Sequence, residues 1–373
     1  MYQKGRAWIE LNISHLLHNV TALKTLLPAH CAMMPAVKAN AYGHGAALIG
    51  KALQKTGIRS FCVASVNEAI ALRNAGITGQ ILVLGYTTPY QFCDLAAYRL
   101  TQTVVDYPYA RELDSYKTPV CVHVGIDTGM HRLGERSDNM EAIRSMWNLK
   151  NLKITGVFSH LCVSDGTSDT ERNYTLEQIQ KFQSVVQYLH QSGIHGFKAH
   201  LQGSYGVLNY PHLSFDYARI GIALYGAYSS PDDRTVAQID LKPVLTLKAR
   251  IECVKLLHAG ESVGYGLDYT AAGEMKIAAV SIGYADGIPR DLSNKGYVLV
   301  NGQRAKMIGR ICMDQLLIDV SEIAQAAAGD EVVLIGKCGE EEITASEFAA
   351  YAGTISNEIL SRLGERLERV EGE

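Results

Sequence analysis

The sequence has little proline and tryptophan and no excess of charge of either sign. Proline occurs 9 times and tryptophan twice in 373 residues, which excludes a collagen-like or proline-rich disordered chain. Lys and Arg total 35 against 38 Asp and Glu, so the chain lacks the basic surface that binds nucleic acid or an anionic membrane. We therefore expect a small molecule as the ligand, with no nucleic-acid or membrane contact by this chain itself.

The sequence also lacks clustered cysteines and long apolar runs. Among eight cysteines the closest pair, Cys312 and Cys338, is 26 positions apart, so no CxxC pair is present and no metal is expected. The first six residues contain no apolar signal core, and the longest uncharged run, residues 74–93, is interrupted by Gly, Gln, Thr and Pro. These features predict a soluble chain on the cytoplasmic, reducing side.

What the sequence does contain, up to about residue 231, is an alternation of β-rich runs and amphipathic helical patterns. Such alternation is typical of a parallel sheet, and eight strands is the number that closes a TIM-type barrel. We therefore predict an α/β fold with a (β/α)8 barrel over residues 12–231. The eight expected strands are Ala32–Lys38, Ser60–Ala64, Gln80–Leu84, Leu100–Val105, Pro119–Ile126, Leu152–His160, His195–Leu201 and Asp216–Gly221.

The pattern changes after the turn at Ser229–Asp233. Val- and Ile-rich runs separated by Gly then predominate, with helix expected only at Ala345–Ala352 and Ser356–Leu363. This pattern predicts a mostly antiparallel β domain over residues 232–373. The N-terminal strand of residues 1–11, which includes the strand-like Ala7–Leu11, is expected to join it.

Several polar residues fall where barrel strands end, which is where TIM-type barrels place their chemistry. Lys38 ends the first strand and His160 the sixth, while Arg132 follows the fifth. Ser204, Gly221 and Ile222 follow the last two strands, where backbone N–H groups often bind phosphate. A lysine amine opposite a phosphate site is compatible with pyridoxal phosphate held as a Schiff base. Each residue taken singly also fits a structural role, so the pattern alone leaves the function open.

Longer motifs resemble the alanine racemase family. The stretch Val37–Gly45 (VKANAYGHG) resembles the cofactor-lysine motif of that family. Further similarities follow in the same order over most of the chain, at Asp127–Gly134 (DTGMHRLG), Phe158–His160, Arg219–Gly226 (RIGIALYG), Val263–Gly266, Ile282–Arg290 (IGYADGIPR), Gly309–Gln315 (GRICMDQ) and Gly353–Leu360 (GTISNEIL).

The resemblance implies a pyridoxal-phosphate barrel followed by a β domain, and a two-base racemisation. Lys38 would hold the cofactor and act on one face of the substrate α-carbon, and Tyr265 from a second subunit would act on the other face. A histidine matching His160 and an arginine matching Arg219 belong to the tyrosine's network. Arg219 would also face the pyridine nitrogen, where a guanidinium keeps that nitrogen unprotonated.

The remaining implied roles concern the phosphate and the substrate. Tyr42 would support the phosphate together with Ser204, Gly221 and Ile222. Arg132 would lie near the cofactor oxygen and the substrate carboxylate, whose geometry its fork matches. The backbone N–H of Met313 from the partner subunit would bind the same carboxylate, and Tyr284 would line the access path. The resemblance thus implies a homodimer with shared active sites.

Three positions depart from the family pattern. Asn357 stands where alanine racemases carry tyrosine, as in the serine/alanine racemases associated with vancomycin resistance, whose racemase part follows a membrane-spanning segment of a longer protein. An asparagine leaves more space and offers hydrogen bonds to a substrate hydroxyl. Gly125 replaces a lysine that braces the arginine matching Arg132. Gly203 replaces an asparagine beside the phosphate-binding serine.

The expected function is therefore racemisation of L- and D-serine and L- and D-alanine, which supplies D-amino acid for peptidoglycan precursors and vancomycin resistance. A plain alanine racemase in which Asn357 is neutral is one alternative. A pyridoxal-phosphate decarboxylase on a similar barrel is a second, but such enzymes favour an acidic residue where Arg219 stands. A non-catalytic pyridoxal-phosphate carrier is a third, and the β domain with its Tyr265 motif argues against it.

Overall fold

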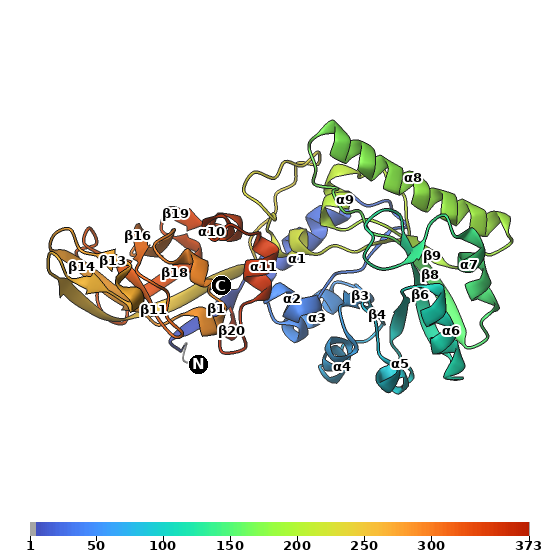
Figure 1. Ribbon diagram of the computed structural model, residues 1–373, viewed down its shortest axis with the longest axis horizontal. Helices are drawn as coiled ribbons and strands as arrows, with labels where there is room; N and C mark the ends of the chain where they lie inside the picture. Colours follow the sequence, from blue (N-terminus) through green and yellow to red (C-terminus); the bar gives the residue numbers. More distant parts are fainter. Residues whose placement is uncertain (1–4, 373) are drawn as a thin grey trace.

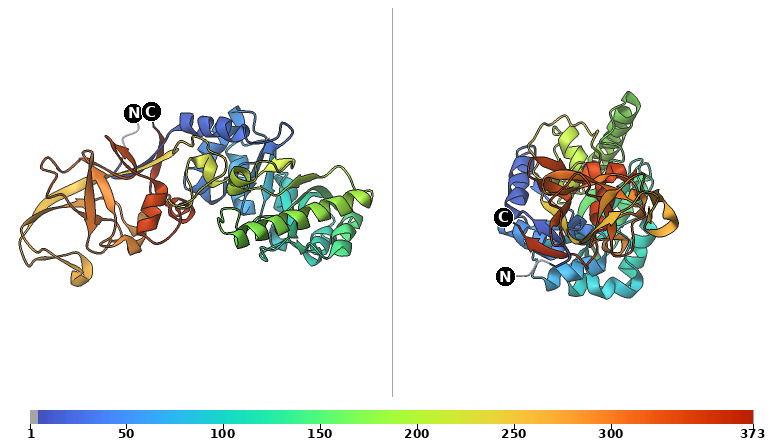
Figure 2. Two further views of the ribbon diagram at one scale, coloured as in Figure 1. Left: turned by 90° about the horizontal axis from the view of Figure 1, so that it is seen from above. Right: turned by 90° about the vertical axis from the view of Figure 1, so that its left-hand side faces the viewer.

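The computed structural model describes residues 5–372 and consists of a barrel and an elongated β domain lying end to end (Figure 1). The first four residues of the expected strand over residues 1–11, and residue 373 of the expected β domain, lie outside the described residues. The described N- and C-terminal segments run side by side (Figure 2), because β1 (Ala7–Leu11) pairs in parallel with β20 (Glu368–Glu371).

The predicted parallel barrel is confirmed. Its strands are hydrogen-bonded in the order β2, β10, β9, β8, β6, β5, β4, β3. The ring is completed at a single bridge between Ala36 and Cys62, where Val37 N–H donates to the Cys62 carbonyl at 2.9 Å. The strand bounds are β2 (Ala32–Met33), β3 (Ser60–Val63), β4 (Gln80–Val83), β5 (Thr101–Val104), β6 (Val120–Asp127), β8 (Leu152–Phe158), β9 (Lys198–His200) and β10 (Tyr217–Ala218), with β7 (Glu135–Arg136) beside β6.

The first strand is shorter than predicted. Strand β2 ends at Met33, although hydrogen bonds to the segment of β10 continue beyond it, since the N–H groups of Met34 and Ala36 donate to the carbonyls of Ala218 and Ile220 at 2.9 and 2.8 Å. Lys38 is therefore not a strand residue. It begins the short segment α2 (Lys38–Tyr42), in which Ala39 to Tyr42 all have φ between 50° and 55° and form a left-handed turn.

Helices surround the barrel, among them α6 (Tyr107–Ser115). The start of α6 carries a recognisable signal, because Asp106 accepts a hydrogen bond from the N–H of Tyr109 at 2.7 Å and Pro108 stands in the first turn. The bounds are α1 (Ile13–Lys24), α3 (Ala46–Lys55), α4 (Val66–Asn74), α5 (Phe92–Ala97), α6 (Tyr107–Ser115), α7 (Met140–Ser145), α8 (Asp169–Gln191) and α9 (Ser204–Asn209). Among the described residues, no helix has both the length and the apolar character needed to cross a bilayer.

The second part of the chain is a mostly antiparallel β domain, as predicted. Its main sheet has the order β19, β18, β15, β16, β17, β14, β11, β1, β20, and β1 pairs antiparallel with β11. The bounds are β11 (Leu245–Leu257), β12 (Ser262–Val263), β13 (Tyr269–Thr270), β14 (Met275–Val280), β15 (Tyr297–Val300), β16 (Gln303–Ile308), β17 (Leu316–Asp319), β18 (Glu331–Cys338) and β19 (Glu341–Ile343), with helices α10 (Ala345–Tyr351) and α11 (Ser356–Ser361).

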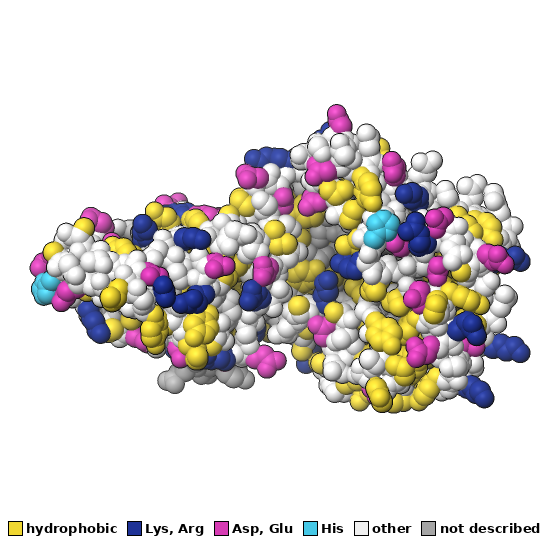
Figure 3. Space-filling model, viewed as in Figure 1, with side chains coloured by type: hydrophobic (Ala, Val, Ile, Leu, Met, Phe, Trp, Pro, Cys, Tyr) yellow, Lys and Arg dark blue, Asp and Glu magenta, His cyan; other side chains and the backbone are white. Residues whose placement is uncertain are grey.

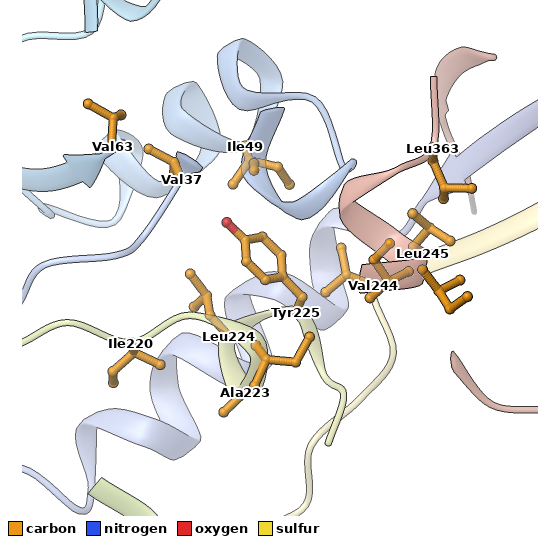
Figure 4. Packing of buried hydrophobic residues seen from close by; sticks show 14 of the residues in the cluster. Val37, Ile49, Val63, Ile220, Ala223, Leu224, Tyr225, Val244, Leu245 and Leu363 are labelled. Carbon is orange, nitrogen blue, oxygen red and sulfur yellow. The ribbon is translucent and has the colours of Figure 1, made fainter. Parts of the chain in front are cut away.

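The two parts share one hydrophobic core. Tyr225 lies between barrel residues such as Val37 and Ile49 and the β-domain residues Leu245 and Leu363 (Figure 4). Its buried hydroxyl donates to the Ala36 carbonyl at 2.8 Å. The β domain is thus packed directly behind the barrel segment that carries Lys38.

Candidate active site

A cavity of about 140 Å³ opens at the carboxyl ends of the barrel strands. The space-filling view shows a hollow between the two parts of the molecule, with Lys and Arg side chains along it (Figure 3). Three cations line the cavity, Lys38, Arg132 and Arg219, and Asp127 is the one acid among its lining residues. Such a cavity favours an anionic ligand. The other lining residues are Ala36, Tyr42, Cys62, Leu84, Thr103, Gly125, Ile126, Met130, Leu133, Phe158, Ser159 and His160.

Lys38 is positioned by the left-handed turn that follows it. L-residues pay about 1–2 kcal/mol each in this conformation, so the turn persists only because neighbouring groups hold it. Glu68 on α4 accepts a hydrogen bond from the N–H of Ala39 at 2.7 Å, and Asn40 accepts one from the N–H of Ala46 at 2.7 Å. Backbone strain of this kind is concentrated at functional sites.

The β domain supports the same turn from behind. Arg369 Nε donates to the Gly43 carbonyl at 3.0 Å. A side chain at Gly43, which has φ of 78°, would place its Cβ only 2.0 Å from the Leu360 carbonyl oxygen on α11. Only glycine permits both this backbone angle and this close approach.

Arg219 follows β10 and is 6% exposed, and all its described hydrogen-bond partners are uncharged. Its Nη1 lies 2.7 Å from His200 Nδ1, and its Nη2 donates to the carbonyls of Ser159 and Leu201. Burial lowers the pKa of Arg219 to about 10, which still leaves it charged at neutral pH. Within residues 5–372, Nε has no hydrogen-bond partner, so Nε–H can serve a ligand.

His160 follows β8 and lies against Arg219, with 3.3 Å between its Nδ1 and Arg219 Nη2. Burial, together with the positive charges of Arg219, Arg132 and Lys38, lowers the pKa of His160 to about 3. The imidazole is therefore neutral at physiological pH. It can accept a hydrogen bond from the guanidinium and present its other ring nitrogen to the cavity.

Ser204 and Gly221 lie together beside Tyr42 in the loops after β9 and β10. The N–H groups of Gly221 and Ala223 donate to Ser204 Oγ at 3.0 and 3.2 Å, and Ile222 begins the 3-10 helix η3 (Ile222–Tyr225). A Cβ at Gly221 would lie 2.6 Å from Tyr42 Oη, so glycine lets the phenol reach this loop. Burial raises the pKa of Tyr42 well above its usual range, which keeps the hydroxyl protonated and able to donate.

Arg132 lies on the exposed loop after β6. Asp127 shapes this loop, accepting hydrogen bonds from the N–H groups of Gly129 and His131 at 3.0 Å. Gly125 lines the cavity and provides no side chain that could hold Arg132. For the part of the chain that the structure describes, we find no hydrogen bond from Arg132.

Asn357 lies on α11, which packs against the Lys38 turn. The Ser229 hydroxyl donates to Asn357 Oδ1 at 2.8 Å. Ser229 is itself fixed, since its N–H donates to Tyr205 Oη at 2.6 Å and its carbonyl accepts from the N–H of Ser356 at 2.9 Å. With Oδ1 occupied, the amide NH2 of Asn357 is the group available to a ligand. Asn357 does not line the cavity itself.

The structure does not bring Tyr265, Tyr284 and Met313 to this cavity. They lie on the β domain with exposed fractions of 69%, 43% and 53%. Tyr265 belongs to the turn between β12 and β13, and β13 lies at the end of the β domain remote from the barrel (Figure 1). The segments of Tyr284 and Met313 are adjacent, because the N–H of Ala285 donates to the Met313 carbonyl at 3.0 Å.

The sequence reasoning missed two residues that shape the site. Glu68 could have been found from a local sequence pattern, because Ser65 and Glu68 have the spacing of a helix capping box and do form one. No local sequence pattern indicates Thr103. It is buried at the cavity wall, and its Oγ1 has no hydrogen-bond partner within the described chain, so a bound group could provide one.

Comparison with known proteins gives matches over both parts of the chain. Residues 11–229 match the family described as alanine racemase, N-terminal domain, and residues 244–371 match alanine racemase, C-terminal domain. An alanine racemase of Carboxydothermus hydrogenoformans is 41% identical over 368 residues, which cover 97% of this chain and 98% of the relative.

Two enterococcal relatives are longer proteins. An amino-acid racemase of Enterococcus faecalis is 43% identical over 363 residues, which are 97% of this chain and 51% of the relative. A serine/alanine racemase of Enterococcus gallinarum is 39% identical with the same coverage, 97% and 51%. The chain thus spans about half the length of these relatives.

Solved structures share the arrangement of the whole chain. Alanine racemase from Bacillus anthracis with bound L-Ala-P has a TM-score of 0.93 at 31% identity and covers 100% of this chain and 96% of its own. Alanine racemase from Bartonella henselae with covalently bound pyridoxal phosphate has a TM-score of 0.86 at 27% identity, covering 99% and 100%. The fold of this chain, a barrel with an attached β domain, is therefore the fold of these racemase structures. The chain belongs to the alanine racemase family.

Proposed function

We propose that the chain is a pyridoxal-phosphate-dependent racemase of alanine and serine, and that two copies of it form each active site. The barrel, residues 12–231, would bind the cofactor, and the β domain, residues 232–373 with the N-terminal strand, would supply residues to the partner. The observation that carries the proposal is the arrangement of Lys38, Arg219, His160 and Tyr42 around one cavity of cationic character.

The residues present fit pyridoxal phosphate. Lys38 offers an amine at one side of the cavity. Tyr42 Oη lies close to Gly221, in the loop where the phosphate is expected, and glycine at 221 permits that approach. Thr103 Oγ1 is buried and lacks a partner among the described residues. The Bartonella henselae relative holds the same cofactor covalently.

Pyridoxal phosphate, when bound, supplies an aldehyde that bonds amines and a ring that accepts the electrons of the substrate α-carbon. Lys38 Nζ would bind that aldehyde, and once the substrate amine had displaced it, the freed amine would take or return a proton on one face of the α-carbon. The partner subunit's Tyr265 would do the same through Oη on the opposite face. Racemisation needs two such groups, because the proton must leave from one side and return from the other.

Arg219 would direct its Nε–H to the ring nitrogen, because its Nη groups are used by His200, Ser159 and Leu201. A guanidinium gives up its proton reluctantly, even with the lowered pKa of about 10 found here. It therefore donates a hydrogen bond without protonating the nitrogen. This limits electron withdrawal by the ring and favours simple proton exchange over side reactions.

Substrate would be held by its carboxylate. Arg132 lines the cavity and has a forked guanidinium suited to a carboxylate. The partner subunit's Met313 would add its backbone N–H, and the partner's Tyr284 would line the access path. The exposure of these β-domain residues within one copy supports their placement at a surface that a second copy covers.

Asn357 supports serine as a second substrate. Ser229 occupies the amide oxygen, so the NH2 group is left to donate to a substrate hydroxyl. A site that hydrogen-bonds a hydroxyl discriminates better than one that only leaves space for it. One relative is named serine/alanine racemase. The proposed role of this chain is to supply D-amino acid for peptidoglycan precursors and vancomycin resistance.

The experiment is to measure kcat/KM for L-serine and L-alanine with the wild-type protein and with Asn357→Tyr. We expect racemisation of both amino acids, and a fall of about tenfold in the serine-to-alanine ratio in the variant. Asn357→Ala is the matched control, because it keeps the space but removes the amide. An unchanged ratio in both variants would leave a plain alanine racemase in which Asn357 is neutral.

A further inference from the structure

Four side chains form one continuous row of contacts through the interior of the barrel. Gln80 on β4 places its Nε2 atom 2.9 Å from Nε2 of His123 on β6. His123 Nδ1 lies 2.8 Å from His200 Nε2, and His200 Nδ1 lies 2.7 Å from Arg219 Nη1. Both histidines are completely buried. The row thus links Arg219 to a residue at the opposite, amino-terminal end of the barrel strands.

The barrel backbone is adapted to this row. A Cβ on Gly156 of β8 would lie 2.6 Å from both Cε1 and Nδ1 of His123, so the imidazole occupies the space that any larger residue would need. Burial, together with the positive charge of Arg219, lowers the pKa of His123 to about 3. The pKa of His200 is lowered for the same two reasons. Both rings are therefore neutral, and each carries one proton on one of its nitrogens.

Arg219 favours one placement of those protons, because a guanidinium only donates. In that placement His200 accepts at Nδ1 and carries its proton on Nε2. That proton is donated to His123 Nδ1, which leaves the proton of His123 on Nε2, facing Gln80. The final group must then accept a hydrogen bond. A carboxamide does so when it is turned by 180° to place Oε1 where Nε2 lies, a change that leaves its shape unaltered.

The opposite order of protons is unfavourable. If the amide of Gln80 donates to His123, each proton in the row moves to the other ring nitrogen. His200 Nδ1–H then faces Arg219 Nη1–H across 2.7 Å, which brings two donors together. Within residues 5–372, no acidic side chain hydrogen-bonds to Gln80, His123, His200 or Arg219. The orientation of the Gln80 amide is therefore coupled to Arg219 through the positions of the protons on the His123 and His200 rings, and not through a change in charge.

We propose that Gln80 and His123 are positioning residues for Arg219. Gln80 accepts the hydrogen bond at the end of the row, and the row holds His200 in its Nε2–H tautomer so that Nδ1 receives Arg219 Nη1–H. That contact fixes the guanidinium plane and leaves Nε–H directed to the ligand. The effect of this positioning on catalysis rests on the proposed racemase function. The assignment of the His123 and His200 tautomers does not depend on that function.

The test compares Gln80→Leu, which removes the acceptor, with Gln80→Glu, whose carboxylate can only accept. Nitrogen-15 NMR of the histidine-labelled holoenzyme reports the tautomer of each ring, and His123→Phe assigns the His123 signals. We expect the wild type and Gln80→Glu to show both rings protonated on Nε2 alone. In Gln80→Leu the buried Nε2–H of His123 has no acceptor, a cost that opposes the preference set by Arg219, so we expect mixed tautomers at both rings.

The kinetic readout is a split between kcat and KM. Loss of one hydrogen bond in the support of a charged group predicts a fall in kcat of about tenfold for Gln80→Leu. KM should stay unchanged, because neither Gln80 nor His123 lines the cavity. Gln80→Glu should have the kcat of the wild type. Ser60→Ala is the matched control, since Ser60 contacts Gln80 at 3.5 Å but does not belong to the row.

Pure Nε2–H tautomers in Gln80→Leu would overturn the proposal, and so would a Gln80→Glu variant that behaves like Gln80→Leu. Failure of the proposed function is a separate result. In that case the wild-type protein racemises neither amino acid, while the NMR signals of the two histidines still decide whether Gln80 controls the row.

Discussion

The barrel and the β domain carry their parts of the candidate site in opposite ways. On the barrel, Lys38, His160 and Arg219 converge on one cavity. Hydrogen bonds hold Arg219 and His160, and the turn that follows Lys38 is held by Glu68 and Arg369. On the β domain, Tyr265 and Met313 are more than half exposed and do not line that cavity within the same copy. A group that is to hold or move a proton needs a defined environment. The difference therefore points to a site that a second copy completes.

A second contrast concerns the β domain itself. Its helix α11 touches the barrel behind the Lys38 turn, where Gly43 meets Leu360. The opposite end of the domain carries Tyr265 on a turn held by the ion pair of Arg310 and Asp268. One end of the β domain therefore contacts the candidate site of its own copy, and the other end is exposed, as the proposed contribution to a second copy requires.

The largest expected effect comes from the barrel side. Lys38→Ala removes the amine that binds the cofactor, so racemisation should fall by more than about 1,000-fold. Mass spectrometry after borohydride reduction should show no cofactor joined to the protein. Lys51→Ala on the exposed face of α3 is the matched control and should remain active. Cofactor still attached in Lys38→Ala would move the assignment to another lysine.

The contact between the two parts gives the next effect. Gly43→Ala places a Cβ against the Leu360 carbonyl and a non-glycine residue at φ of 78°. We expect it to lower the free energy of unfolding by more than about 2 kcal/mol, measured by urea denaturation.

Gly57→Ala separates the two causes. Gly57 has a similar φ of 88° but nothing within 4 Å of the added Cβ. Its cost should be limited to about 1 kcal/mol of backbone strain. If the two variants lost the same free energy of unfolding, the approach of α11 to the Lys38 turn would contribute no steric constraint.

Acid should destabilise the barrel through its buried histidines. Burial lowers the pKa of His44 to about 4 and those of His123 and His160 to about 3, so the unfolded state binds more protons below pH 6.5. The free energy of unfolding should therefore fall between pH 7 and pH 5, by on the order of 1 kcal/mol per histidine for each pH unit below 6.5.

Urea denaturation at the two pH values measures this loss. The β domain contains one histidine, His258, which is exposed. His258→Gln should leave the pH dependence unchanged. A free energy of unfolding that does not change between pH 7 and pH 5 would contradict the neutral state of the barrel histidines.

The sequence predicts the architecture well because strand and turn patterns are local. All eight barrel strands were expected, and Ala7–Leu11 is the observed β1. Helices α5 and α9 have six residues each, too few for a periodic pattern to be recognised. The left-handed turn after Lys38 could not be predicted, because Ala39, Asn40 and Ala41 favour right-handed conformations and the stabilising contacts come from Glu68 and Arg369.

The candidate site is only partly readable from the sequence. The strand-end rule places Lys38, Arg132, His160 and Arg219 at one edge, and the structure puts them around one cavity. The row from Gln80 to Arg219 depends on strand register instead, since His123 and His200 are 77 positions apart. No local pattern connects such residues, and none reveals which surface a second copy covers.

Co-expression of Lys38→Ala with Tyr265→Phe tests the shared site most directly. Each variant alone should be inactive, since every site lacks one of the two groups. In mixed dimers that share sites, one site carries both substitutions and the other carries neither. Random pairing of equal amounts should therefore restore about one quarter of wild-type activity. No recovery in mixtures that contain mixed dimers would place Lys38 and Tyr265 in the same copy's site and contradict the account.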